Sequence, residues 1–120
     1  MSNQTNVVSI HPYFKVKPGQ LAAAKAILPK MAAQTAPEKL MIQYDFTING
    51  DEIFCRESYI GADGLLAHVE NIGALLGEFL KFVDLARVEV HGQAAELEKL
   101  KGPLAGLKPV WFVYECGANR

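Results

Sequence analysis

The sequence has little cysteine, little tryptophan and almost no net charge, and these shortages exclude several classes of protein. Its 2 cysteines, Cys55 and Cys116, lie far apart in the 120 residues, without the paired spacing of a zinc site or a CxxC redox motif. The 12 Lys and Arg nearly balance the 13 Asp and Glu, so no basic surface is available for nucleic acid or for an anionic membrane. Small molecules and other proteins remain as partners.

The chain also lacks a long apolar run and a basic, apolar leader. Met1–Asn6 carries neither, so we expect a cytoplasmic protein with reduced thiols and a flexible N-terminus over residues 1–6. Hydrophobic residues make up 50% of the chain, which predicts one globular domain over residues 1–120. A domain of this size buries only about two-thirds of its unfolded surface, so part of its apolar surface is expected to enter a subunit interface.

Hydrophobic periodicity predicts a regular order of elements. Apolar residues at helical spacing predict helices over 21–35 and from about 63 to 79, the second with a break at Gly73 or Gly77, and a short one over 94–101. Alternating apolar residues predict strands over 7–16, 40–48, 52–60, 85–91 and 110–115. We therefore expect an α+β, ferredoxin-like βαββαβ fold with both helices on one face, extended by a short helix and a C-terminal strand.

The dipeptide Asn49-Gly50 predicts a two-residue hairpin turn between the second and third strands. That turn fixes which residues lie opposite one another on the two strands. The expected pairs are Phe46 with Ile53, Tyr44 with Cys55, Ile42 with Glu57, and Leu40 with Tyr59. One face of the hairpin is then apolar except for the carboxylate of Glu57.

A carboxylate on a face that helices cover needs a partner, a proton or water. His68 stands one turn from Leu65 and Ile72 on the helix expected to cover that face, so it is the candidate partner of Glu57. The hydroxyls of Tyr44 and Tyr59 are expected to reach the same pocket. The alternative is structural: Glu57 and His68 satisfy each other, and the tyrosines are core residues with hydroxyls at the edge.

A second polar set is expected on the face that the helices leave uncovered, where it fits a salt-bridged dimer interface. Its members are His11, Arg56, Arg87, Glu89 and His91. A glycine-rich phosphate loop, a serine nucleophile elbow and an HExxH zinc pair are all absent from the sequence. The three histidines come from separate elements, so we expect no metal site.

Three short motifs resemble the antibiotic biosynthesis monooxygenase-like family of the dimeric α/β-barrel superfamily. They are Phe14-Lys15-Val16-Lys17-Pro18-Gly19 before the first helix, Phe54-Cys55-Arg56-Glu57-Ser58-Tyr59 in the third strand, and Leu65-Leu66-Ala67-His68 in the second helix. The resemblance extends from Ser9 to about Val90. It implies a homodimer in which two ferredoxin-like sheets meet face to face, each protomer with a pocket between its sheet and helices.

The resemblance also implies a range of reactions. Some family members oxygenate phenols or quinols without metal or flavin, and others degrade haem, isomerise small sugar phosphates or have no known activity. The haem-degrading branch resembles this chain poorly, because Pro12, Tyr59 and Glu78 stand where that branch has asparagine, tryptophan and the haem-ligand histidine.

The leading hypothesis is therefore a small monooxygenase that needs no cofactor and acts on a phenolic or quinol-type molecule. His68 would be the base, Glu57 would orient its imidazole and raise its basicity, and Tyr44 and Tyr59 would bind the substrate oxygen. An isomerase that uses the same acid and base is the rival hypothesis. A non-catalytic, dimeric ligand-binding or stress-response module is the third, and closed packing around Glu57 and His68 would favour it.

Overall fold

The computed structural model describes residues 6–118 and shows an α+β fold. The expectation for residues 1–6 falls almost entirely on residues 1–5, which lie outside the described range. In chain order the elements are β1 (Val7–Val16), α1 (Leu21–Thr35), β2 (Met41–Asn49), β3 (Glu52–Ile60), α2 (Gly61–Phe79), β4 (Val83–Gly92), α3 (Ala94–Leu100), the short 3₁₀ helix η1 (Ala105–Leu107) and β5 (Val110–Val113). The described elements follow the order that periodicity predicts.

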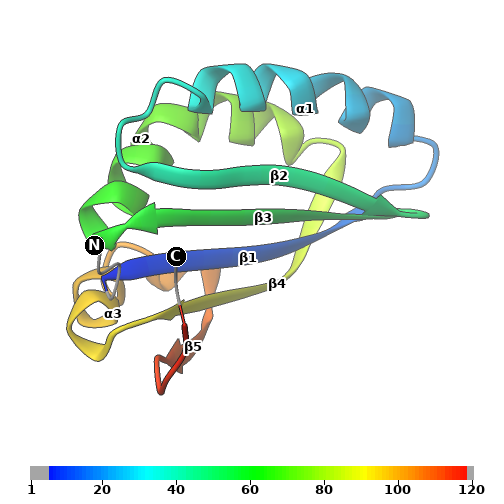
Figure 1. Cartoon of the computed structure of the whole chain (residues 1–120). Helices are drawn as coiled ribbons and strands as arrows, with labels where there is room; N and C mark the ends of the chain where they lie inside the picture. Colours follow the sequence, from blue (N-terminus) through cyan, green and yellow to red (C-terminus); the bar gives the residue numbers. More distant parts are fainter. Residues whose placement is uncertain (1–5, 119–120) are drawn as a thin grey trace.

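The strands form one sheet in the order β2-β3-β1-β4-β5. The first four strands are antiparallel neighbours in ferredoxin-like order, and β5 adds to β4 in parallel. Helices α1 and α2 lie side by side over one face of the sheet (Figure 1). The ferredoxin-like prediction is confirmed, and within residues 6–118 no helix covers the other face of the sheet.

Helix α2 is continuous, contrary to the expected break at Gly73 or Gly77. Its apolar face packs on the sheet through Leu65, Ile72 and Phe79, all buried. That burial outweighs the weak helix preference of two glycines on the exposed side. A single rigid helix therefore carries His68 over the sheet.

The β2–β3 hairpin has a different register from the one predicted. Gly50 takes a positive φ of 60° and is the first residue of a two-residue turn, Gly50-Asp51. In the predicted turn, Asn49-Gly50, it would have been the second. Asn49 therefore pairs with Glu52, and the partners of Phe46 and Tyr44 shift by two residues, to Cys55 and Glu57. Because that shift is even, Tyr44 and Phe46 keep the predicted face. Glu57 now lies opposite Tyr44 instead of Ile42.

A bulge before Gln43 changes the register again, so that Met41 pairs with Tyr59. The bulge leaves Ile42 exposed and packs Met41 against the core, contrary to the prediction.

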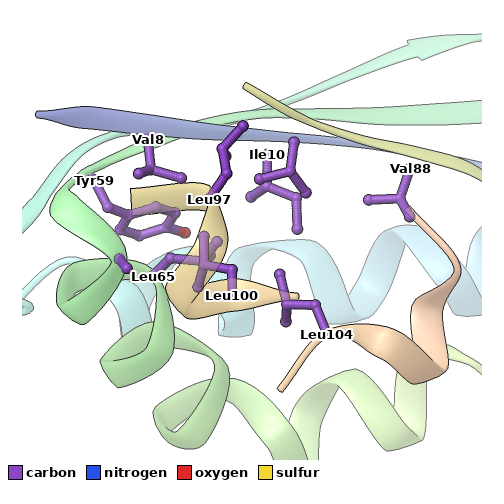
Figure 2. Packing of buried hydrophobic residues seen from close by; sticks show 10 residues of the cluster. Val8, Ile10, Tyr59, Leu65, Val88, Leu97, Leu100 and Leu104 are labelled. Carbon is purple, nitrogen blue, oxygen red and sulfur yellow. The ribbon is translucent and has the colours of Figure 1, made fainter. Parts of the chain in front are cut away.

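Two clusters of buried side chains form the core between sheet and helices. One joins Tyr59, Leu65 and Leu104 with residues of β1 and β4, and Figure 2 shows these side chains meeting between the sheet and α3. The other gathers around Phe14 and Phe79 at the far end of the sheet.

Both cysteines are free, but only Cys55 is in the core. Cys116 is exposed beyond β5, because the last strand ends three residues before it. Within residues 6–118, none of the helices has the length and apolar composition that crossing a membrane requires.

Candidate active site

A cavity of about 290 Å³ lies between the sheet and helix α2. It is lined by side chains from both core clusters. Among the described residues that line it, only Tyr44, Cys55, Glu57 and His68 have polar side chains. The cavity is thus an apolar chamber with one polar wall, close to the lower end of the size range of small-molecule sites.

Glu57 is the centre of the polar wall. Its position on β3 points it toward the helices, and it is 7% exposed. The Tyr59 hydroxyl donates a hydrogen bond to Glu57 Oε1 at 2.5 Å, and His68 Nε2 lies 3.5 Å from the same oxygen. Burial raises the pKa of Glu57 to about 7, against the opposing effect of the nearby Tyr59 and Cys55 side chains. Near neutral pH this carboxyl group is therefore present in both protonation states.

His68 reaches the wall from α2 and is held from several sides. Its ring lies between those of Tyr44 and Tyr59, with centroids 4.9 and 5.0 Å away. Its Nδ1 lies 2.9 Å from Glu38 Oε2, and because a carboxylate only accepts hydrogen bonds, Nδ1 carries the proton. Burial lowers the pKa of His68, although Glu38 opposes that effect. The imidazole is then neutral, with Nε2 free to accept a hydrogen bond.

Glu38 is a site residue that the sequence did not reveal. It lies in the loop between α1 and β2, thirty positions before His68, and no periodicity marks it. Asn71 Nδ2 donates to Glu38 Oε2 at 2.8 Å and also to the backbone oxygen of Gln34 at 2.9 Å. These bonds fix Glu38, which in turn fixes the tautomer and orientation of His68.

The two predicted tyrosines occupy different places. Tyr44 lines the cavity, and burial raises the pKa of its phenol, so it stays a hydrogen-bond donor. Tyr59 is fully buried behind the wall and is not among the cavity-lining residues. Its hydroxyl acts on Glu57 rather than facing the cavity directly.

The structure thus brings Glu57, His68 and Tyr44 together beside a cavity, and divides their roles differently from the expectation. Glu38, not Glu57, orients the imidazole of His68, and Glu57 is the group whose pKa lies near neutrality. Such a wall can remove a proton from a bound molecule and return it. Within the described part of the chain, no three His, Cys, Asp or Glu side chains are grouped so as to hold a metal ion.

The second polar set lies on the uncovered sheet face, away from the cavity. Arg87 Nε donates to Glu89 at 2.8 Å, and Glu89 also lies 3.2 Å from His91 Nε2. The rings of His11 and His91 meet edge to face with centroids 4.7 Å apart. Arg56 lies over the ring of Phe54, which in turn stacks on His11.

Comparison with solved structures finds similarity over nearly the whole chain. The crystal structure of MupZ from Pseudomonas fluorescens superposes with a TM-score of 0.92 at 38% sequence identity, over 96% of this chain and 95% of MupZ. No protein-family model matches the chain, and no curated protein does.

More distant structures share the fold alone. An antibiotic biosynthesis monooxygenase superposes with a TM-score of 0.61 at 15% identity, over 69% of this chain and 92% of its own. Rv0793 from Mycobacterium tuberculosis gives a TM-score of 0.62 at 23% identity, over 70% of this chain and 91% of its own. Both match over most of their own length, and each leaves more than a quarter of this chain unmatched.

Proposed function

The chain belongs to the same family as MupZ, within the fold of the antibiotic biosynthesis monooxygenase-like proteins, and on this premise we propose that it is an acid–base enzyme. Its substrate would be a small, mostly apolar molecule bound in the cavity beside Glu57. One observation carries the proposal. Glu57 is a buried carboxyl group in a cavity wall, and its pKa of about 7 lets it accept and donate protons at neutral pH.

The reaction that this wall supports best is a proton shift within the substrate. Glu57 would take a proton from carbon beside a carbonyl group and return it at another position, so that no proton is gained or lost overall. Tyr44, held protonated by burial, would donate a hydrogen bond to the carbonyl oxygen while it carries negative charge. His68 would accept or supply the proton of Glu57 through Nε2.

Cofactor-independent oxygenation of a phenol or quinol is the second candidate, favoured by the name of the monooxygenase that shares the fold. It would use the same base to form a substrate anion that reacts with O₂. Glu57 and Glu38 both lie near the reacting end, and no Lys or Arg is among the described residues that line the cavity. Both reactions form a substrate anion without such a cation, but the proton shift needs only the proton-transfer and hydrogen-bonding groups of the wall, whereas oxygenation also needs O₂. We therefore rank the proton shift first.

Comparing turnover under air and under argon separates the two reactions. A β,γ-unsaturated cyclohexenone reports the proton shift through the ultraviolet absorbance of the conjugated product, and a hydroquinone in an oxygen electrode reports oxygenation. We expect isomerisation at equal rates under both gases. Replacement of Glu57 by Gln should lower the rate by about 10²- to 10⁴-fold.

Glu52→Gln is the matched control, because Glu52 is an exposed carboxylate on the same strand. Full activity of Glu57→Gln would refute the role of this carboxyl group. Activity that stops under argon would assign the oxygenase reaction instead.

We also propose that the protein works as a homodimer through its uncovered sheet face. Aromatic and imidazole rings gather on that face: Phe54 lies 4.8 Å from Tyr13, and Phe112 stacks on His91 at 4.5 Å. Half-buried aromatic side chains of this kind are typical of protein interfaces. A second copy would cover them without blocking the cavity, which lies on the opposite face.

A further inference from the structure

The cavity has two chemically different halves, and the sheet order separates them. Tyr44 on β2 lies opposite Glu57 on β3, and these strands form one side of the sheet. Val88 and Leu85 on β4 line the other side of the cavity, beyond the central strand β1. Because neighbouring strands are about 4.8 Å apart, the apolar half extends roughly 10 Å from Glu57.

The segment 103–107, which follows α3, closes this apolar half. Leu104 is 2% exposed and belongs to the same buried cluster as Val88, and Figure 2 shows both side chains in that cluster. Two other lining residues are partly exposed: Leu107 in η1 at 37%, and Leu80, directly after α2, at 38%. Lining residues that are this exposed mark the mouth, so the mouth is apolar and lies between α2 and η1.

The charge of the lining restricts what the cavity can hold. Among described residues, the ionisable groups of the lining are Tyr44, Cys55, Glu57 and His68, none of which is a permanent cation. A carboxylate, sulfonate or phosphate group would lose its hydration in the cavity without a counter-ion and close to a carboxyl group, which disfavours its binding. An uncharged molecule meets no such penalty.

We infer that the cavity selects a neutral molecule with one hydrogen-bonding group and an apolar body, and that residues 103–107 set its size limit. The hydrogen-bonding group faces Glu57 and His68, and the apolar body lies along β1 and β4 against Leu104 and Leu107. The inference rests on the proposed function only in naming Glu57 as the reacting end. Binding itself can be measured without turnover.

Two dyes of one skeleton test the charge rule. N-phenyl-1-naphthylamine is neutral, and 8-anilino-1-naphthalenesulfonate adds a sulfonate to the same ring system. We expect the neutral dye to bind with enhanced fluorescence and the anionic dye to bind at least tenfold more weakly. Equal affinity for both dyes, or no binding of the neutral dye, would overturn the inference.

Substitutions in segment 103–107 test the size limit. Gly106 lines the cavity and a Cβ there meets no atom within 4 Å, so Gly106→Phe adds a large side chain to the lining without a clash at its Cβ. This substitution should lower the affinity for the neutral dye at least tenfold. The control Gly73→Phe, at an equally open glycine that does not line the cavity, should leave the affinity unchanged. Equal affinities for the two variants would show that segment 103–107 does not bound the site.

A second pair of variants keeps the test valid if Gly106→Phe does not fold. Leu107→Ala removes apolar contact at the mouth of the cavity and should lower the affinity for the neutral dye roughly tenfold. Leu21→Ala is its control, because Leu21 is also 37% exposed but lies outside the lining. No difference between these variants would overturn the inference. Glu57→Gln should retain dye binding while losing turnover, so binding and catalysis can fail separately.

Discussion

At the scale of single residues, the site depends on how two buried ionisable groups share their surroundings. Burial disfavours the charged form of each, so it raises the pKa of Glu57 and lowers that of His68. Glu38 then acts on both, since it supports a charge on His68 and opposes one on Glu57. The carboxyl group thereby becomes the proton-transfer group, and the imidazole its neutral partner.

Glu57 should make the fold less stable as pH rises. Its pKa is about 7 in the folded state and 4.5 in its ordinary state, so the folded chain binds more protons between these values. The free energy of unfolding should then fall by about 3 kcal/mol from pH 4.5 to above 7, relative to Glu57→Gln. Urea unfolding of both proteins across this pH range measures it. Parallel curves for the two proteins would contradict the raised pKa.

Glu38 should act as a positioning residue for His68. Replacing Glu38 with Gln removes a negative charge that raises the pKa of His68, so that pKa should fall further. Replacing it with Ala should also release the Nδ1–H tautomer, because the acceptor is gone. Long-range ¹H–¹⁵N spectra of the imidazole report both changes. The control is Glu70→Gln, because Glu70 is an exposed carboxylate on α2, the helix that carries His68. This control should alter neither the pKa nor the tautomer of His68. Unchanged spectra in both Glu38 variants would refute the positioning role.

At the scale of elements, helix α2 approaches the sheet closely at Gly64. A Cβ there would lie 3.0 Å from Tyr59 Cβ, 3.1 Å from Leu40 Cβ and 3.3 Å from the backbone oxygen of Leu40. Gly64→Ala should therefore cost about 1–3 kcal/mol of folding free energy by forcing the helix away. Gly73→Ala, in open space on the same helix, should instead stabilise by up to about 1 kcal/mol. Urea unfolding measures both, and stabilisation by both would show that the close approach is not required.

The elements themselves could largely be predicted from the sequence, because each buries one face. Alternation predicted the bounds of β1 and β3, and helical spacing predicted α1. The hairpin register could not be read, since Asn49-Gly50 and Gly50-Asp51 both provide a glycine turn and only strand packing decides between them. Glu38 was missed for a related reason: its contact with His68 depends on where a loop packs against α2.

At the scale of the whole molecule, the sheet has one covered face and one uncovered face. The covered face holds the core and the cavity, so the catalytic proposal needs only one chain. The uncovered face holds paired rings and the Arg87–Glu89–His91 group, which would be buried only against another chain. Dimer formation and catalysis can therefore be altered separately.

The protein should have the mass of two 13.1 kDa chains in light scattering after size-exclusion chromatography. The ring of Phe54 lies against those of His11 and Tyr13 on the uncovered face. Phe54→Lys would therefore place a charge in the proposed dimer interface and should give monomers. Leu21→Lys, an exposed leucine on α1, should leave the mass unchanged. A monomeric wild type, or a dimeric Phe54→Lys, would place the dimer contact elsewhere or exclude it. Because the cavity opens on the opposite face, the Phe54→Lys monomer should still bind the neutral dye.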